Sequence, residues 1–181
     1  MLEVRTISRK DSQSSTFDVG RVPLDVGYYL AGFADGEGSF NVAFRKRRDY
    51  RQAPWKVSLC FNVSQRDEEI LRLFQRQLGC GSMRTRADGV WYFEVNSLED
   101  ITNNVVPFFE RFGFLSAKKK RDFLKFKKLA VLMKEGKHLT GEGLLEVLAI
   151  RSDMNDGGAK RRKYSDEQIL HLLRESSEAI R

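Results

Sequence analysis

The chain has 181 residues, of which 41% are hydrophobic and 11% aromatic, so it can bury a core in one domain and is not intrinsically disordered. Its formal net charge of +7 favours a polyanionic partner, a class that includes nucleic acid, phosphate-rich small ligands and acidic membranes. No apolar run approaches the roughly 20 residues that cross a bilayer and no apolar signal core is present, so we expect a soluble intracellular protein with no membrane partner.

The N-terminal part of the chain predicts an arm, a helix and two strands. Residues 1–24 are polar and mixed, which indicates a loose arm. Asp25 fits the N-cap of a helix from Val26 to about Asp35, where the following glycines stop it. Apolar and polar residues alternate over 39–47 and again over 55–65, a pattern typical of half-buried strands.

The middle of the chain predicts a helix followed by a β-hairpin. Asp67 can cap a helix that ends near Leu78 and carries a single apolar stripe. The stripe consists of Ile70, Leu71, Phe74 and Leu78. After the glycines at 79–81, residues 82–86 and 90–95 predict two strands joined by an Ala-Asp-Gly turn.

Two helices complete the predicted core. Ser97 with Asp100 indicates the start of a helix that runs past Pro107 to about residue 112, and a longer helix is predicted over about 116–134. The order over 26–134 is therefore helix, two strands, helix, two strands and two helices. This order predicts an α+β domain whose antiparallel sheet is covered by helices on one face.

The remaining residues predict a basic, helical C-terminal extension. A loop at 135–143 precedes a short helix at 144–155, and a basic linker precedes a final helix that opens with a Ser165–Gln168 capping box. We therefore divide the chain into an N-terminal arm at 1–24, a core at 25–134 and an extension at 135–181.

The solvent face of the predicted strands carries amides, hydroxyls and cations, and the residues we assign to it include no acid. They are Asn41, Arg45, Arg47, Lys56, Ser58, Asn62, Ser64, Arg84 and Arg86. Arginine pairs with guanine edges, asparagine with adenine, and serine with either, and a β-ribbon fits the major groove of DNA. An ordinary hydrated sheet face is the alternative, but a one-signed composition favours a base-reading surface.

Two acids, Asp35 and Glu37, stand at the C-terminal tip of the first helix, which is the unfavourable end of the helix dipole for a negative charge. Phosphodiester hydrolysis needs a stabilised anionic transition state and an activated water, and carboxylates can supply both by holding Mg²⁺. The two cysteines and two histidines have no spacing that indicates a metal site or a catalytic triad. The alternative is that the acids are solubilising residues only.

Ala31 and Gly32 remove side-chain bulk from an otherwise bulky helix. A second helix could then pack against it backbone to backbone, and a single such helix per chain implies a symmetric dimer with two Glu37 carboxylates side by side. Packing of the small pair against the chain's own core is the alternative, and the sequence leaves both open.

Residues 30–38, LAGFADGEG, resemble the signature of the LAGLIDADG homing endonucleases, and the αββαββα order is similar to that family's core. The resemblance covers about 26–134, and Gln65 with FGFLSAKKKRDFLKFKKL at 112–129 makes it highly specific. It implies a saddle-shaped homodimer with a curved antiparallel DNA-binding sheet, in which each motif helix contributes a metal-binding acid.

The resemblance also assigns roles to single residues. Glu37, where many members have Asp, is the metal ligand and catalytic acid, the Gly36 carbonyl is the neighbouring ligand, and Asp35 is structural. The implied cofactor is Mg²⁺, with Ca²⁺ or Mn²⁺ as substitutes in binding. Gln65 organises solvent around the attacking water, and Lys118 stabilises the transition state.

Glu69 departs from the pattern, because some members have a basic residue there. Lys119 or Lys120 is then needed as a replacement cation, and we expect at least one lysine of 118–120 only to anchor DNA phosphate.

We therefore expect a site-specific, Mg²⁺-dependent endonuclease that cuts a long pseudo-palindromic DNA duplex and leaves short 3′ overhangs. No protein-splicing domain flanks the motif, so we expect a free-standing intron-encoded enzyme, in a chloroplast, a mitochondrion or a bacterial or archaeal cytoplasm. The alternative is a non-catalytic nucleic-acid binder on the same fold, either an intron RNA maturase or a transcription regulator. A purely structural dimerisation module leaves the cationic sheet face unexplained.

Overall fold

The structure, a computed structural model, describes residues 17–46, 55–154 and 163–171. The core elements are α1 (Leu24–Glu37), β1 (Gly38–Lys46), β2 (Trp55–Gln65), α2 (Glu68–Leu78), β3 (Ser82–Thr85), β4 (Trp91–Val95), α3 (Leu98–Asp100), the π-helical turn η2 (Ile101–Val105), α4 (Val106–Phe112) and α5 (Ala117–Lys134). The 3₁₀ turn η1 (Val19–Arg21) precedes them, and η3 (Lys137–Leu139) and α6 (Gly141–Ser152) follow.

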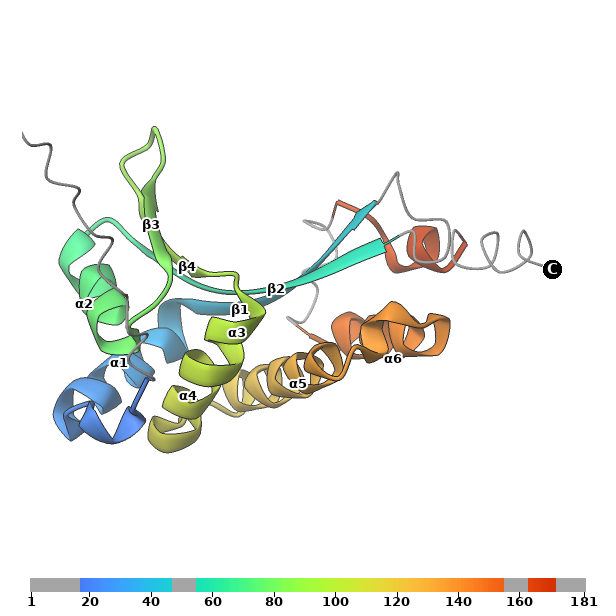
Figure 1. Cartoon of the computed structure of the whole chain (residues 1–181). Helices are drawn as coiled ribbons and strands as arrows, with labels where there is room; N and C mark the ends of the chain where they lie inside the picture. Colours follow the sequence, from blue (N-terminus) through green and yellow to red (C-terminus); the bar gives the residue numbers. More distant parts are fainter. Residues whose placement is uncertain (1–16, 47–54, 155–162, 172–181) are drawn as a thin grey trace, which may run out of the picture.

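One antiparallel sheet organises the molecule, with the strand order β1-β2-β4-β3. The strands form a curved sheet, and α1, α4, α5 and α6 lie along one side of it, while no helix of the described residues covers the middle of the opposite side (Figure 1). This arrangement confirms the predicted α+β class. The open side is the surface on which a long ligand could lie.

Phenylalanine rings fill the space between the sheet and its helices. Phe40, at the start of β1, packs against five other rings with centroid distances of 4.9 to 5.8 Å. These rings belong to Phe61, Phe109, Phe114, Phe123 and Phe126. Because they come from β2, α4, α5 and the turn before α5, this cluster fixes the start of β1 against three other elements.

Strong local patterns gave the right elements. β2 has the predicted bounds, and α2 buries the predicted apolar stripe. Asp67 accepts a hydrogen bond from the Glu69 amide at 3.0 Å, and Gly79 ends the helix in the left-handed region with a φ of 65°. The predicted hairpin is present, closed by a hydrogen bond from the Arg86 amide to the Val90 carbonyl at 3.0 Å.

Several boundaries differ from the prediction. α1 begins at Leu24 with Pro23 at its N-cap, so Asp25 lies inside the first turn, where its charge still complements the dipole. α1 also continues through Gly36 to Glu37. The helix predicted to run past Pro107 is interrupted by the wide turn η2 just before this proline, which has no amide hydrogen to donate.

The described part of the N-terminal arm is not loose. Asp18 caps η1 by accepting a hydrogen bond from the Gly20 amide at 2.9 Å, and Val22 is 4% exposed. Arg111 of α4 donates a hydrogen bond to the Val19 carbonyl. Residues 17–22 therefore pack onto the helical layer, while residues 1–16 of the predicted arm lie outside the described residues.

The described part of the C-terminal extension, residues 135–154 and 163–171, packs against the outer end of the sheet (Figure 1). Thr140 caps α6 by accepting from the Gly143 amide at 3.1 Å, so this helix begins three residues before the predicted start at 144. Arg151 of α6 is 4% exposed, lies over the Phe44 ring of β1 at 4.9 Å and pairs with Asp166 at 3.1 Å.

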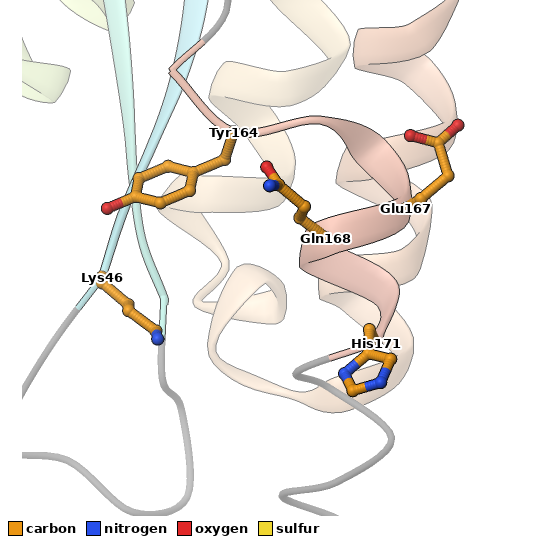
Figure 2. Close-up of a pocket in the computed structure, with 5 residues that line it drawn as sticks. All are labelled: Lys46, Tyr164, Glu167, Gln168 and His171. Carbon is orange, nitrogen blue, oxygen red and sulfur yellow. The ribbon is translucent and has the colours of Figure 1, made fainter.

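The predicted capping box of the final helix is present. The Ser165 amide donates to the Gln168 side chain at 2.9 Å, and the Gln168 amide donates to the Ser165 hydroxyl at 3.2 Å. A pocket of about 440 Å³ lies between this helix and Lys46 at the end of β1 (Figure 2). Within the described ranges, no helix is long and apolar enough to cross a membrane.

Candidate active site and nucleic-acid interface

The tip of α1 passes directly into β1 at Gly38. A Cβ atom on this residue would lie 2.6 Å from the Ala34 carbonyl oxygen, so only glycine allows the close approach. The preceding Gly36 and Glu37 are exposed. The chain thus presents a carboxylate and an open backbone at the point where the helix meets the sheet.

Asp35 connects this tip to the start of α5. Its carboxylate accepts hydrogen bonds from the Leu115 amide at 3.1 Å, from the Ser116 amide at 2.9 Å and from the Ser116 hydroxyl. Burial alone would raise the pKa of Asp35, but the hydrogen bonds from Ser116 and Leu115 and the charge of Lys119 hold it below its ordinary value. These contacts support the structural role that the resemblance implies for Asp35.

Lys119 is the lysine that α5 brings to the tip. Its ammonium group donates a hydrogen bond to the Gly38 carbonyl, the first residue after Glu37. Burial lowers the pKa of Lys119 below its ordinary value, and the nearby carboxylates of Asp35, Asp122 and Glu37 offset this only in part. Lys118 and Lys120 are exposed on the same turn. The geometry therefore brings Lys119 to the tip, while the role predicted for Lys118 stays a prediction.

Gln65 lies at the same end of the sheet. Gly38 pairs with Val63, so Gln65 at the end of β2 extends just past the first residue of β1. Its side-chain oxygen accepts a hydrogen bond from the Arg66 amide at 2.8 Å. Glu69 is exposed in the first turn of α2, with no basic residue in its place.

The donors at the tip suit a hard cation, because a carboxylate and a backbone carbonyl are the oxygen ligands that Mg²⁺ prefers. Across residues 17–46, 55–154 and 163–171, no three or more metal-binding side chains gather in one place. Burial raises the pKa of Cys60 to about 11 and of Cys80 to about 12, which leaves both thiols protonated at neutral pH.

The strand register places the predicted DNA-binding residues on the open face of the sheet. Paired residues share a face, and the pairs on this face alternate with buried pairs such as Phe40 with Phe61. The pairs on the open face of β1 and β2 are Ser39–Asn62, Asn41–Cys60, Ala43–Ser58 and Arg45–Lys56. Ser64 and Arg84 both pair with Tyr92 on the same face. Arg47 lies outside the described residues.

The sequence analysis assigned no acid to this face, but the structure places one there. Glu94 of β4 pairs with Asn62 and Ser82 and therefore lies among the predicted contact residues. It binds Arg84 through two hydrogen bonds, at 3.0 and 2.6 Å. The alternation within 90–95 could have revealed both Tyr92 and Glu94, since Glu94 lies between two buried residues and Tyr92 between a half-buried and a buried one.

The exposed side of α1 is narrow and apolar. A Cβ atom added to Gly32 or to Gly36 would have no other atom within 4 Å, whereas Tyr28 and Tyr29 beside them are each 57% exposed. Ala31 is 2% exposed and packs in the core of its own chain, and the expectation that it lines an interface stays a prediction. Gly32, the next residue of the helix, faces open space.

Comparison with known proteins gives a consistent result. Residues 30–130 match the family model described as LAGLIDADG endonuclease. "Probable intron-encoded endonuclease 2" of Neurospora crassa is 32% identical over 151 residues, which make up 81% of this chain and 33% of that protein. The chain thus spans about a third of the length of this relative.

Solved structures of similar fold include nucleases. The homing endonuclease I-TnaI is 31% identical, with a TM-score of 0.69 over 86% of this chain and 97% of that one. The LAGLIDADG homing endonuclease I-SmaMI bound to cleaved DNA is 30% identical, with a TM-score of 0.68 over 72% of this chain and 44% of that one.

Proposed function

The chain belongs to the LAGLIDADG endonuclease family, and from this premise we propose that it is a site-specific, Mg²⁺-dependent DNA endonuclease that acts as a homodimer. The observation that carries the proposal is the position of Glu37. This exposed carboxylate stands at the junction of α1 and β1. It lies between the open sheet face and the bare side of α1, which is the exposed side that carries Gly32 and Gly36. A catalytic acid would stand there next to both the DNA and a second copy of the chain.

Glu37 and the Gly36 carbonyl are the residues that would hold the metal. A bound divalent cation neutralises charge on the phosphate and lowers the pKa of water. Gly36 has no side chain, and a Cβ atom at this position would have no other atom within 4 Å, so phosphate oxygens can approach the backbone closely. Ca²⁺ or Mn²⁺ would fit the same donors for binding.

The neighbouring residues support the reaction without being metal ligands. Lys119, held against the Gly38 carbonyl, places a positive charge beside Glu37 that can stabilise the developing negative charge of the transition state. Gln65 keeps its amide nitrogen available while its oxygen accepts from Arg66, so it can orient a water. Lys118 and Lys120 are exposed and suit contacts with phosphate.

The substrate we propose is a long duplex with pseudo-two-fold symmetry. Two copies joined through the bare side of α1 would extend two sheets along the DNA, and two Glu37 tips would act on the two strands across the minor groove. Short 3′ overhangs would result. Relatives such as that of Neurospora crassa carry names that describe an intron-encoded origin, so we propose an intron-encoded enzyme that acts where its host DNA resides, in an organelle or in a bacterial or archaeal cytoplasm.

A two-step selection tests this function. Duplexes from a randomised library are first bound to the full chain in Ca²⁺, and the enriched pool is then incubated with Mg²⁺ and its ends are sequenced. We expect cuts at one pseudo-palindromic class of site, with short 3′ overhangs. Specific binding without any cutting would instead indicate a non-catalytic binder, such as an intron RNA maturase or a transcription regulator.

Lysine substitutions separate chemistry from anchoring. Lys119→Met should slow single-turnover cleavage by on the order of 100-fold or more, because one stabilising donor is lost from the transition state. Lys120→Met should leave the cleavage rate of bound DNA unchanged, weaken binding to all sequences alike and lower the salt slope of binding by about one unit. Equal cleavage rates for the two variants at saturating protein would contradict the role of Lys119.

A further inference from the structure

Four residues form a rigid group on the open face of the β3–β4 hairpin. Glu94 accepts two hydrogen bonds from Arg84, from Nε at 3.0 Å and from Nη2 at 2.6 Å. The guanidinium of Arg84 lies 4.6 Å from the centre of the Tyr92 ring, and that of Arg86 lies 4.5 Å from the same ring. Arg84 is thus held from its edge by a carboxylate and from its face by an aromatic ring.

This fixation leaves a defined part of Arg84 for another partner. A guanidinium carries five N–H donors, and Glu94 uses the one on Nε and one on Nη2. The two donors on Nη1 and the second on Nη2 form a further fork at the end of the side chain. Such a fork matches the O6 and N7 acceptors of guanine in the major groove.

Glu94 is poorly placed to contact a base itself. Its side chain is 17% exposed, while that of Arg84 is 46% exposed. Both Glu94 oxygens already accept from Arg84, and these hydrogen bonds hold the pKa of Glu94 below its ordinary value despite burial. The carboxylate therefore remains charged and oriented toward Arg84.

We propose that Arg84 reads a guanine through its Nη1–Nη2 end, and that Glu94 and Tyr92 are positioning residues that determine this specificity. The inference rests on the proposed DNA-binding function. It adds to that function the base that is recognised and the two residues that hold Arg84 in position. Arg86 stacks on the same ring, but no carboxylate pairs with it in the described chain. Arg86 is thus a cation that is stacked on the ring but not fixed from two sides.

The charge of Glu94 gives the proposal a distinct signature. A negative charge on a surface that faces a polyanion weakens binding to every DNA sequence. Glu94→Gln removes this charge and replaces one acceptor oxygen by a donor that cannot pair with Arg84. Binding to unrelated DNA should therefore become tighter, while discrimination at one base pair becomes weaker. A general loss of folding would weaken both.

The test is a base-preference profile for the full chain, measured by selection from randomised duplexes and sequencing. Wild type should prefer guanine at one position in each half-site, and Arg84→Ala should lose roughly 5- to 150-fold of that preference, which is the discrimination of a bidentate contact. Glu94→Gln and Tyr92→Leu should reduce the preference at the same position. Arg76→Ala, the same exchange at an exposed arginine in the last turn of α2, should leave it intact.

The outcomes distinguish this inference from the function on which it rests. A wild-type chain without any base preference would overturn the proposed function and the inference together. A wild-type preference for guanine that persists in Glu94→Gln would overturn the inference alone, as would a change confined to another base pair. Thermal melting of each variant shows whether it is folded, and a variant with wild-type melting and a selective loss at one position supports the proposal.

Discussion

Glu37→Gln should abolish DNA cleavage in Mg²⁺ and leave DNA binding intact. The substitution keeps the size of the side chain and removes the charge that a cation needs. We expect the single-turnover rate to fall by on the order of 1,000-fold or more, since metal assistance contributes several kcal/mol to the transition state. Because the Glu37 side chain is exposed and makes no hydrogen bond with the described residues, folding should not change.

Binding in Ca²⁺ provides the second measurement. Loss of one negative charge beside the phosphates should leave the affinity unchanged or slightly higher. Glu142→Gln, the same exchange at an exposed site in the first turn of α6, is the matched control and should cut at the wild-type rate. Undiminished cutting by Glu37→Gln would show that the tip of α1 is not the catalytic centre.

The sequence was most informative where one local pattern decided the structure. β2 matches its predicted bounds because residues 55–64 alternate without interruption, and α2 matches because its cap, its stripe and its terminal glycine agree. Glu37 was also predicted near the helix tip, although α1 continues through Gly36 and does not stop at Asp35. In these places, local propensity and tertiary packing favour the same result.

The sequence was less informative where rotation about a helix axis decided the outcome. Ala31 and Gly32 are adjacent and both small, yet a turn of about 100° buries the first and exposes the second. Lys118, Lys119 and Lys120 are identical in type, and only the packing of α5 onto β1 selects the one that reaches the Gly38 carbonyl. Such choices depend on contacts between elements far apart in the chain.

Strand pairing also limited how much of the site could be predicted from the sequence. The residues between Arg84 and Glu94 form the hairpin, and its register brings these two side chains together across β3 and β4. An alternating pattern gives the face of each strand, but it does not show which cation meets which acid. The fixed orientation of Arg84 is therefore a property of the fold and not of either strand alone.

Gly32→Leu should convert the protein into a folded monomer that does not cleave DNA. A Cβ at Gly32 meets no atom within 4 Å, so the chain itself has room for the leucine. Leucine also favours a helix more than glycine does, by roughly 0.5–1 kcal/mol, so the melting temperature of the monomer should not fall. Any loss of activity would then come from the missing partner.

The dimer has no such room if two α1 helices meet at this face. Overpacking destabilises an interface by about 1–3 kcal/mol per site, and a two-fold symmetric dimer would contain two of these leucines. The monomer should bind half of the target weakly and fail to bring two Glu37 side chains together. Sedimentation with and without target DNA measures the state of assembly, and single-turnover cleavage measures its consequence.

Gly141→Leu is the control for this prediction. Gly141 is also exposed, and a Cβ atom there would have no other atom within 4 Å, but it lies at the first residue of α6, away from the bare side of α1. This variant should remain a fully active dimer, because it adds the same side chain without touching the proposed interface. A wild-type chain that stays monomeric on its target, or a Gly32→Leu variant that remains an active dimer, would show that α1 does not join two copies.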